Sequence, residues 1–366
     1  MTLKEELEII RGEPIEVRTV KPEDVPCIET SDAEKLCKRP LVSVQMITYN
    51  HEPYIRQAIE GVLMQQTNFD YELIIGEDCS QDQTREICLE YQKKYPDKIR
   101  VLWWHENVSL LGGNSRRCKA RCRGEFIALC EGDDYWTDPL KLQKQVDVMR
   151  AHHNVNLVFG KTSTYFQSKG VEKSGLSRFK EGVIPGHDFV LSGIVASTLT
   201  MMVRKSALIA AEDKYEIFNW RLYLGDKVVW IAMSLLGDVY YLDQLLGVYR
   251  VHSGGVTSRG DGRVKRDGGV VSAYFSRCSS IFPSGYLTSA IMQIYKYRIA
   301  GVASRRSFSE RRQLLRKLYD EIRYDTNIRN AVFRPCVVLS ALAGNRLHNF
   351  YCRVESAVLK AIATAI

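Results

Sequence analysis

The residues best suited to chemistry are three carboxylates within four positions, Glu131, Asp133 and Asp134, in the stretch LCEGDDYW. They follow the apolar run FIAL, which is typical of a buried strand, so we expect them where that strand ends. Like charges this close repel one another, and a strand end offers them little water. Oxygen ligands of this kind suit Mg²⁺ or Mn²⁺, which usually meet substrate phosphates through one or two carboxylates. A metal and phosphate site is the favoured interpretation, and a solvated turn is the alternative.

Polar side chains follow two other apolar runs in the same way. Thr48, Tyr49 and Asn50 come after PLVSVQMI, and Glu77 with Asp78 comes after YELIIG. In open α/β sheets, ligands bind beyond the carboxyl ends of the strands. We therefore expect these side chains and the acidic cluster to converge on one crevice.

The elements that must position these groups alternate between strand and helix from residue 41 to about residue 152. Each of four β-branched or apolar runs is followed by a stretch with helical periodicity. This alternation predicts an α/β fold with a mostly parallel sheet that helices cover on both faces.

The helical pattern loosens between residues 154 and 258. NVNLVFGKTSTYF and STLTMMVRK predict strands, the second by alternation, whereas GDKVVWIAMSLLG predicts a buried helix. VYYLDQLLGVYRVHSGG has the pattern of a strand pair.

Composition and charge exclude several classes of protein. The 366 residues are 45% hydrophobic and 26% charged, as in ordinary globular chains. No apolar stretch approaches the roughly 18 to 20 residues that cross a bilayer, and the N-terminus lacks the layout of a signal peptide. Ten cysteines occur without a CxxC pair, which argues against a zinc site and fits a reduced, cytosolic compartment.

The net charge of +8 is concentrated in one part of the chain. From residue 286 onward, fourteen Lys and Arg stand against five Asp and Glu, so the remainder is close to neutral. Nucleic acid is therefore not an expected partner of the main body. The basic region has an amphipathic helical pattern, which suits either packing on the main domain or peripheral contact with an anionic membrane surface.

Together these patterns divide the chain into four segments. We predict an N-terminal helix and extended arm at 1–40, a catalytic α/β domain at 41–258, a mobile loop at 259–285 and a basic helical region at 286–366. The loop assignment follows from a stretch rich in Gly, Ser and charge.

The motifs, in order, resemble bacterial family 2 glycosyltransferases of the GT-A fold. The stretches that carry the resemblance are VSVQMITYNHEPYIRQAIEGVLMQ, ELIIGEDCSQDQTREI, GEFIALCEGDDYWTDPLKLQKQVD, YLGDKVVW and GVYRVHSGGVTS. Each alone is a weak signal, but all five in sequence order are specific and span most of residues 41–258. The resemblance implies a GT-A type, mostly parallel sheet flanked by helices, followed here by a basic helical C-terminal extension.

The resemblance also assigns roles around the acidic cluster. EGDD corresponds to the family's DxD-type motif, which makes Asp133 a metal ligand, and YRVH supplies a second ligand, His252. An imidazole ligand shifts the preference from Mg²⁺ toward Mn²⁺. Glu131 replaces the usual aspartate and would reach the ribose or, through water, the metal. Asp134 would face the sugar or support the loop. The cluster precedes Trp136, which we also expect to bind substrate, and would sit at the mouth of the crevice.

Other positions match the nucleotide side of the family's site. ITYN would form the wall of the nucleotide pocket with Thr48, Tyr49 and Asn50. In GEDCS, Asp78 is the favoured acceptor of the N–H of the base, and Glu77 is the alternative.

Three further residues complete the predicted site. Asp226 in YLGDKVVW matches the catalytic base, which deprotonates the acceptor hydroxyl and gives an inverted product; a helix N-cap is a compatible role. Arg117, or its neighbour Arg116, lies near a Gly-Gly helix start and would contact the donor phosphates. Arg250 would face the diphosphate or pair with a carboxylate.

The predicted function is a cytoplasmic, metal-dependent, inverting glycosyltransferase with Mn²⁺ or Mg²⁺ as cofactor. Its donor would be a nucleoside-diphosphate sugar, with UDP favoured. Its acceptor would be a saccharide or a lipid-linked saccharide in surface polysaccharide or glycan synthesis, which would bring the protein to the inner face of the cytoplasmic membrane.

Two alternatives stay open. A sugar nucleotidyltransferase shares the architecture and the metal, but it usually has a Gly-rich, basic loop where this chain has TYNHEPY. A catalytically degenerate transferase that serves as a binding module is the other alternative, against which the intact Asp133, Asp226 and His252 argue.

Overall fold

The computed structural model describes residues 26–108, 113–174, 179–192, 196–215 and 225–255, which all belong to one unit, Glu16–Arg259. The loop predicted at 259–285, the basic helices predicted at 286–366 and the helix predicted at the start of 1–40 lie outside the described residues.

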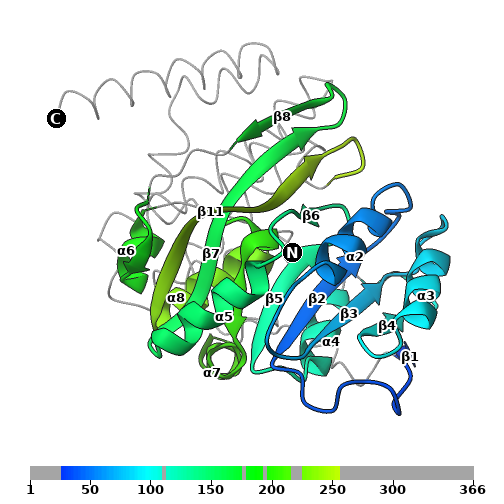
Figure 1. Cartoon of the computed structure of the whole chain (residues 1–366), viewed down its shortest axis with the longest axis horizontal. Coiled ribbons are helices and arrows are strands. Elements are labelled where there is room, and N and C mark those ends of the chain that lie inside the picture. Colours follow the sequence, from blue (N-terminus) through cyan, green and yellow to red (C-terminus); the bar gives the residue numbers. More distant parts are fainter. Residues whose placement is uncertain (1–25, 109–112, 175–178, 193–195, 216–224, 256–366) are drawn as a thin grey trace, which may run out of the picture. The chain divides into compact units, whose positions relative to one another are not determined.

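One mixed sheet organises the described residues, with the strand order β1-β4-β3-β2-β5-β10-β7-β11-β6 (Figure 1). Its first half contains the parallel block β4-β3-β2-β5, in which each strand runs in the direction predicted from the alternating pattern. The strands of this half are β1 (Ile28–Thr30), β2 (Val42–Thr48), β3 (Tyr71–Glu77), β4 (Ile99–Trp103) and β5 (Phe126–Glu131).

The second half of the sheet begins where β10 joins β5 in the antiparallel direction. It continues through β7 to β11, which run parallel to one another, and β6 closes the edge against β11. Its strands are β6 (Tyr135–Trp136), β7 (Val155–Phe166), β8 (Val171–Ser174), β9 (Gly182–Ile184), β10 (Met202–Arg204) and β11 (Asp238–Val251).

Helices connect and cover these strands (Figure 1). They are α2 (Ile55–Leu63), α3 (Thr84–Lys94), α4 (Gly113–Arg121), α5 (Lys141–Ala151), α6 (Gly186–Leu191), α7 (Lys205–Tyr215) and α8 (Gly225–Leu236), with a 3₁₀ turn η3 (Thr198–Thr200). Among the helices of the described ranges, none combines the length and the apolar character that a bilayer span requires.

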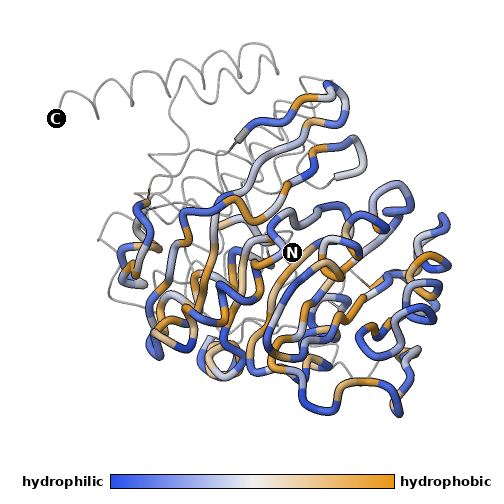
Figure 2. Tube along the Cα trace, in the orientation of Figure 1, coloured by the Kyte–Doolittle hydropathy of each residue, from blue (hydrophilic) through white to orange (hydrophobic). Residues whose placement is uncertain are grey.

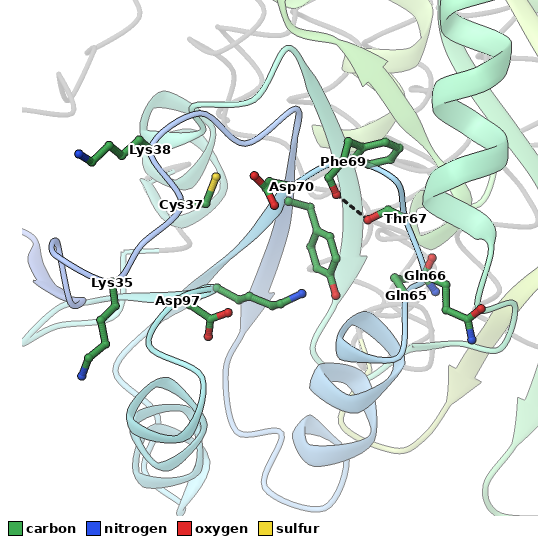
Figure 3. Close-up of a pocket in the computed structure, with 11 residues that line it drawn as sticks. Lys35, Cys37, Lys38, Gln65, Gln66, Thr67, Phe69, Asp70 and Asp97 are labelled. Atoms are coloured by element: carbon green, nitrogen blue, oxygen red, sulfur yellow. Dashed lines mark hydrogen bonds between the residues drawn. The ribbon is translucent and has the colours of Figure 1, made fainter.

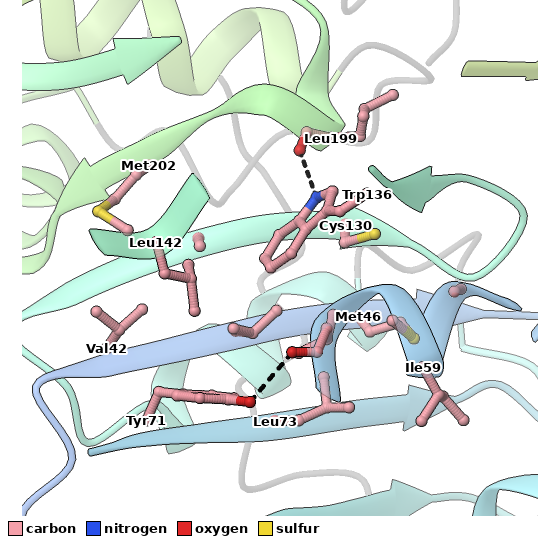
Figure 4. Close-up of a cluster of buried hydrophobic side chains, with 14 of the residues drawn as sticks. Val42, Met46, Ile59, Tyr71, Leu73, Cys130, Trp136, Leu142, Leu199 and Met202 are labelled. Carbon is pink, nitrogen blue, oxygen red and sulfur yellow. Dashed lines mark hydrogen bonds between the residues drawn. The ribbon is translucent and has the colours of Figure 1, made fainter. Parts of the chain in front are cut away.

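Both faces of the central strands are covered, because alternate side chains meet different helices. Val42, Val44 and Met46 of β2 are completely buried in the core that α2, α3 and α5 complete (Figure 4). On the opposite face, the amide of Gln45 donates to the hydroxyl of Ser115 in α4. Figure 2 shows the apolar segments gathered along the central strands and the polar ones on the outer loops. The predicted α/β fold with a covered, mostly parallel first half is confirmed.

Three local predictions differ from the structure. The segment predicted as a strand pair is the single strand β11, which follows β7 throughout and absorbs its irregularities as register shifts near Leu242 and Leu245. The stretch STLTMMVRK is a strand only at Met202–Arg204, since η3 precedes it. The predicted arm contains β1, which pairs with β4 in the antiparallel direction.

A lysine lies inside the core beneath the acidic loop. The side chain of Lys141 is completely buried, its Nζ donates to Gln145 Oε1 at 2.8 Å, and the same atom lies 3.9 Å from the ring centroid of Trp136. Burial lowers the pKa of Lys141 to about 7, although nearby Cys130 and Asp138 oppose the shift. An unfolded chain would hold this proton up to its ordinary pKa of about 10.4.

Replacing this lysine with methionine should stabilise the protein most at low pH. Between pH 7 and pH 10 the unfolded chain binds more protons than the folded chain, so the free energy of unfolding rises with pH across this window. That gain is lost as pH falls through the window to 7, and the cost of burying a charged lysine is then largest. We expect Lys141→Met to raise the free energy of unfolding by about 1–3 kcal/mol at pH 6 and by less at pH 9. Urea unfolding at several pH values measures this, and an equal effect at both pH values would contradict it.

Candidate active site

The carboxyl ends of three parallel strands meet in register. Thr48 at the end of β2 pairs with Glu77 at the end of β3, and Ile47 pairs with Glu131 at the end of β5. The loops that follow are tied to β2, because the backbone N–H of Asp78 donates to the carbonyl of Thr48 at 3.0 Å. The three predicted groups of polar residues therefore lie at one edge of the sheet.

The loop after β2 is fastened to the loop after β3 by side chains. The backbone N–H of Asn50 donates to Ser80 Oγ at 2.9 Å, and Asn50 Oδ1 accepts from the backbone N–H of Gln81 at 2.8 Å. Asn50 adopts a φ of 55°, in the left-handed region that asparagine tolerates better than most residues. Its amide oxygen thus joins two loops, which differs from the predicted contact with a nucleotide.

Three side chains from distant parts of the sequence converge into a potential metal site. His252 Nε2 lies 3.0 Å from Asp133 Oδ2, and His51 Nε2 lies 3.7 Å from the same oxygen. One ligand atom from each residue lies within 4.8 Å of the others. The predicted pair Asp133 and His252 is therefore brought together. The sequence analysis did not identify His51; the available signal was its position three residues beyond Thr48, in the loop that follows β2.

The two aspartates of the acidic loop are separated electrostatically. Burial, the charge of Asp133 and the charge of Glu131 raise the pKa of Asp134 well above its ordinary value. Burial also acts on Asp133, but the hydrogen bond from His252 and the charge of His51 bring its pKa below the ordinary value. Of the two, Asp133 therefore ionises more readily than Asp134. Burial is also the main cause of the lowered pKa of His51, which favours the neutral imidazole that binds metals.

Arg250 holds this loop from the side of β11. Its guanidinium donates to the carbonyl of Asp133 at 2.9 Å, to Gln57 Oε1 at 2.7 Å and to Gln167 Oε1 at 3.3 Å. The guanidinium carbon also lies 4.8 to 5.7 Å from the centroids of three tyrosine rings, those of Tyr54, Tyr135 and Tyr165. Arg250 is 8% exposed, so it positions the acidic loop rather than facing a diphosphate.

Asp134 and Trp136 belong to the support of the loop. Asp134 is 2% exposed, and its Oδ1 accepts the backbone N–H of Arg250 at 2.8 Å, which matches the predicted supporting role and not a sugar contact. Trp136 lies in the core, where its indole N–H donates to the carbonyl of Leu199 at 2.7 Å (Figure 4). Trp136 was predicted to bind substrate, but its ring is 2% exposed, packs against Lys141 and donates its N–H to the core.

The two carboxylates after β3 also differ in their contacts, although both are completely buried. Glu77 accepts the backbone N–H of Ser80 at 2.6 Å and forms an ion pair with Arg85. Asp78 Oδ1 accepts the backbone N–H of Val108 at 2.7 Å. Both carboxylates therefore have partners within the protein, and Glu77 alone of the two forms an ion pair with Arg85.

The arginines of α4 point to different surroundings. Arg116 lies 3.8 Å from a carboxylate oxygen of Glu212 in α7. Arg117 is 4% exposed, and its guanidinium carbon lies 5.4 Å from the ring centroid of Trp104. Burial lowers the pKa of Arg117, and the charge of Asp78 partly reverses the shift. Among the described side chains, none bonds to its Nε or Nη1. Arg116 thus pairs with α7, whereas Arg117 packs on Trp104.

Thr48 and Tyr49, at the end of β2, differ in how exposed their side chains are. Tyr49 is 37% exposed, as expected of a ring that could stack on a base. Thr48 is buried against Gly132, where an added Cβ would lie 2.6 Å from Thr48 Oγ1 and 3.0 Å from His51 Nδ1. Gly132 thus lets the acidic loop approach both residues. Glu131 is half-buried at the end of β5.

The predicted base lies in the first turn of α8, where Asp226 follows Gly225. Helix starts favour negative charge, which is consistent with the capping role expected of this residue. The description of the structure at Asp226 is limited to its backbone.

A separate hollow lies at the opposite edge of the sheet (Figure 3). Its volume is about 650 Å³, and its lining includes Asp70, Tyr71, Asp97 and Lys98, which stand at the amino ends of β3 and β4. The strand ends with the acidic loop lie away from this hollow, so it is not part of the candidate active site.

Replacing Arg250 with lysine should remove part of the hydrogen bonding that holds the acidic loop, while the positive charge at position 250 is kept. Lysine cannot reach three acceptors in a fork, nor stack between tyrosine rings in the same way. We expect Arg250→Lys to lower the free energy of unfolding by about 2–4 kcal/mol, measured by urea unfolding. The control is Arg56→Lys, which alters a pair with Glu90 whose side chains are 50% and 59% exposed and should have little effect. Equal effects of the two variants would contradict the role of Arg250.

Comparison with known proteins agrees with this geometry. The family model described as glycosyl transferase family 2 matches residues 43–207. An uncharacterised protein of Mycobacterium tuberculosis is 31% identical over 217 residues, which cover 59% of this chain and 60% of that protein. The putative teichuronic acid biosynthesis glycosyltransferase TuaG of Bacillus subtilis is 26% identical over 222 residues, or 60% of this chain and 82% of the relative.

A solved structure shares the fold. Residues 1–349 of TarS from Staphylococcus aureus, in complex with UDP-GlcNAc, match with a TM-score of 0.59 at 19% identity, covering 85% of this chain and 91% of that one. This likeness shows a common architecture and is independent of the motifs. The chain therefore carries, over residues 43–207, a family 2 glycosyltransferase domain, and its sheet has the GT-A fold.

Proposed function

We propose that the protein is a metal-dependent, inverting glycosyltransferase that moves a sugar from a nucleoside-diphosphate donor to a hydroxyl of a saccharide or lipid-linked acceptor. The observation that carries the proposal is the convergence of Asp133 and His252, with His51, at the strand ends of a family 2 domain. These residues fit a divalent cation, because a carboxylate and imidazoles present their lone pairs to a common point.

The donor side of the proposal rests on the residues around Asp78. Asp78 would accept an N–H of the base, Tyr49 would stack on the base, and Arg117 would contact the donor phosphates. The names of the relatives support a nucleotide sugar and polysaccharide synthesis: TarS was crystallised with UDP-GlcNAc, and TuaG is described as acting in teichuronic acid biosynthesis. We take a UDP-linked sugar as the first donor to test.

The proposed reaction moves one proton to Asp226 and releases one leaving group, the nucleoside diphosphate. The acceptor oxygen attacks the anomeric carbon while Asp226 takes its proton, and the bond from that carbon to the diphosphate breaks on the opposite face. The nucleoside diphosphate leaves with the bonding electrons. When bound, the cation would neutralise the charge that develops on this diphosphate. Asp133 and His252 would hold the cation, and Arg250 would keep the loop of Asp133 in place.

The proposed acceptor and the proposed location rest on the sequence alone. Contact of residues 286–366 with a membrane and a cytoplasmic location stay predictions.

Turnover of a panel of nucleotide sugars with Mn²⁺ tests the proposed activity. We expect release of nucleoside diphosphate that stops with EDTA, whereas release of pyrophosphate would support a nucleotidyltransferase instead. Asp133→Asn and Asp226→Asn should each lower kcat by about 100-fold or more, since one holds the cation and the other takes the proton. Full activity of Asp133→Asn at saturating metal would remove the metal assignment, and full activity of Asp226→Asn would remove the base.

Substitution of Tyr49 tests the predicted stacking on the base. Loss of one base–aromatic stack costs about 1–3 kcal/mol, so Tyr49→Ala should raise the donor Kd by roughly 5- to 150-fold. Tyr49→Phe keeps the ring and should bind the donor nearly as well as the native protein. Calorimetric titration with the nucleoside diphosphate measures both variants. Comparable loss in Tyr49→Phe would show that the hydroxyl, and not the ring, makes the contact.

A further inference from the structure

The side chain of His51 lies close to Asp133 without forming a hydrogen bond to it. Its Nε2 faces the same oxygen of Asp133 that His252 contacts, and the two imidazole rings meet edge-on with centroids 6.1 Å apart. The distance of 3.7 Å between His51 Nε2 and Asp133 Oδ2 is too long for a hydrogen bond. A simple His–Asp hydrogen bond therefore accounts for His252 but not for His51.

The backbone holds His51 in this place. Its N–H donates to Thr84 Oγ1 at 2.8 Å, and its carbonyl accepts from the backbone N–H groups of Tyr54 and Ile55, each at 2.8 Å. The residue is thus part of the entry to α2. Gly132 lies against its Nδ1. The ring is therefore confined between the start of a helix and the acidic loop, with Nε2 directed to Asp133.

The distances between the three side chains suit binding of one cation. Metal bonds to imidazole nitrogen and carboxylate oxygen are about 2.0–2.2 Å long, so neighbouring ligand atoms stand roughly 3.0–3.5 Å apart. The measured separations from Asp133 Oδ2 are 3.0 Å for His252 and 3.7 Å for His51, and the full set lies within 4.8 Å. Small movements would bring all of these atoms to one ion.

We propose that His51 is a third protein ligand of the cation, and that the resulting set of two imidazoles and one carboxylate selects a transition-metal ion over Mg²⁺. Magnesium prefers oxygen ligands in a strict octahedral arrangement, whereas imidazole nitrogen suits first-row transition metals. Three protein ligands leave positions for oxygens of the donor diphosphate. The inference deepens the proposed function, since the same cation would serve the transfer reaction, but metal binding can be measured without any donor.

The first experiment compares metals on the native full-length chain, stripped with EDTA and dialysed. Mn²⁺ binding is followed by the loss of the electron paramagnetic resonance signal of the free ion, and Mg²⁺ is added as competitor. We expect Mn²⁺ to bind at least about tenfold more tightly than Mg²⁺. Added Co²⁺ should give a visible spectrum with the bands of nitrogen ligation. Equal affinities for Mn²⁺ and Mg²⁺ would overturn the proposed selectivity.

The second experiment removes the imidazole. His51→Asn should weaken Mn²⁺ binding by about tenfold or more and change the Co²⁺ spectrum, while its affinity for Mg²⁺ should change less. The matched control is His153→Asn, which alters an exposed histidine outside the cluster and should bind Mn²⁺ like the native chain. Thermal unfolding without metal checks that His51→Asn is folded. If it is not, the number of imidazole nitrogens bound to Mn²⁺ in the native chain, counted by pulsed electron paramagnetic resonance, decides: two are expected, and one alone would overturn the role of His51.

The outcomes separate this inference from the proposed function. Unchanged Mn²⁺ affinity in folded His51→Asn would overturn the role of His51, even if the native enzyme transfers sugar. Weakened Mn²⁺ binding with no turnover of any donor would support His51 as a ligand while the proposed transferase activity fails.

Discussion

Two adjacent carboxylates, half-buried Asp133 and buried Asp134, stand in one short loop, and the candidate site is arranged around the repulsion between them. Their pKa values are driven in opposite directions, since Asp134 faces two other negative charges and Asp133 faces two imidazoles. Asp134 bonds to the backbone of Arg250 and joins the protein frame. Asp133, whose pKa is lowered instead, presents the oxygen that His51 and His252 both face. One acidic pair thereby supplies both a structural group and a ligand.

Arg250 connects this loop to the far half of the sheet. The guanidinium is buried. Within the described residues it donates to a backbone carbonyl and two side-chain amides, and it packs against tyrosine faces. A planar, delocalised cation is suited to such a setting, because it can donate in its plane and stack above it. β11 carries Arg250 and ends at Val251, so the strand that braces the acidic loop also places His252, the next residue, beside Asp133.

Most elements of the first half could be predicted because their signals are local. Apolar β-branched runs and helical periodicity identified β2, β3, β4 and β5 with their helices, and alternation of the two gave parallel pairing. β11 was misjudged because its interior, around Leu242 and Leu245, has the irregular pattern of a turn; pairing with β7 turns these irregularities into bulges. Nothing in the local sequence distinguishes the two cases.

The sequence by itself determined which chemistry is available: carboxylates and polar groups at the ends of buried strands, in the order of a family 2 glycosyltransferase. Tertiary structure decided which of these groups remain free for chemistry. Asn50, Glu77 and Trp136 have the right residue type and place in the motifs. Within the protein, however, these side chains bond to residues that the motifs do not single out: Gln81, Arg85 and Leu199, respectively. His51 gains its role in the reverse way, because its significance depends on Asp133, which joins it only when β2 and β5 pair. Hydrogen bonding and burial are properties of such distant contacts, and a sequence pattern reports only the local part of them.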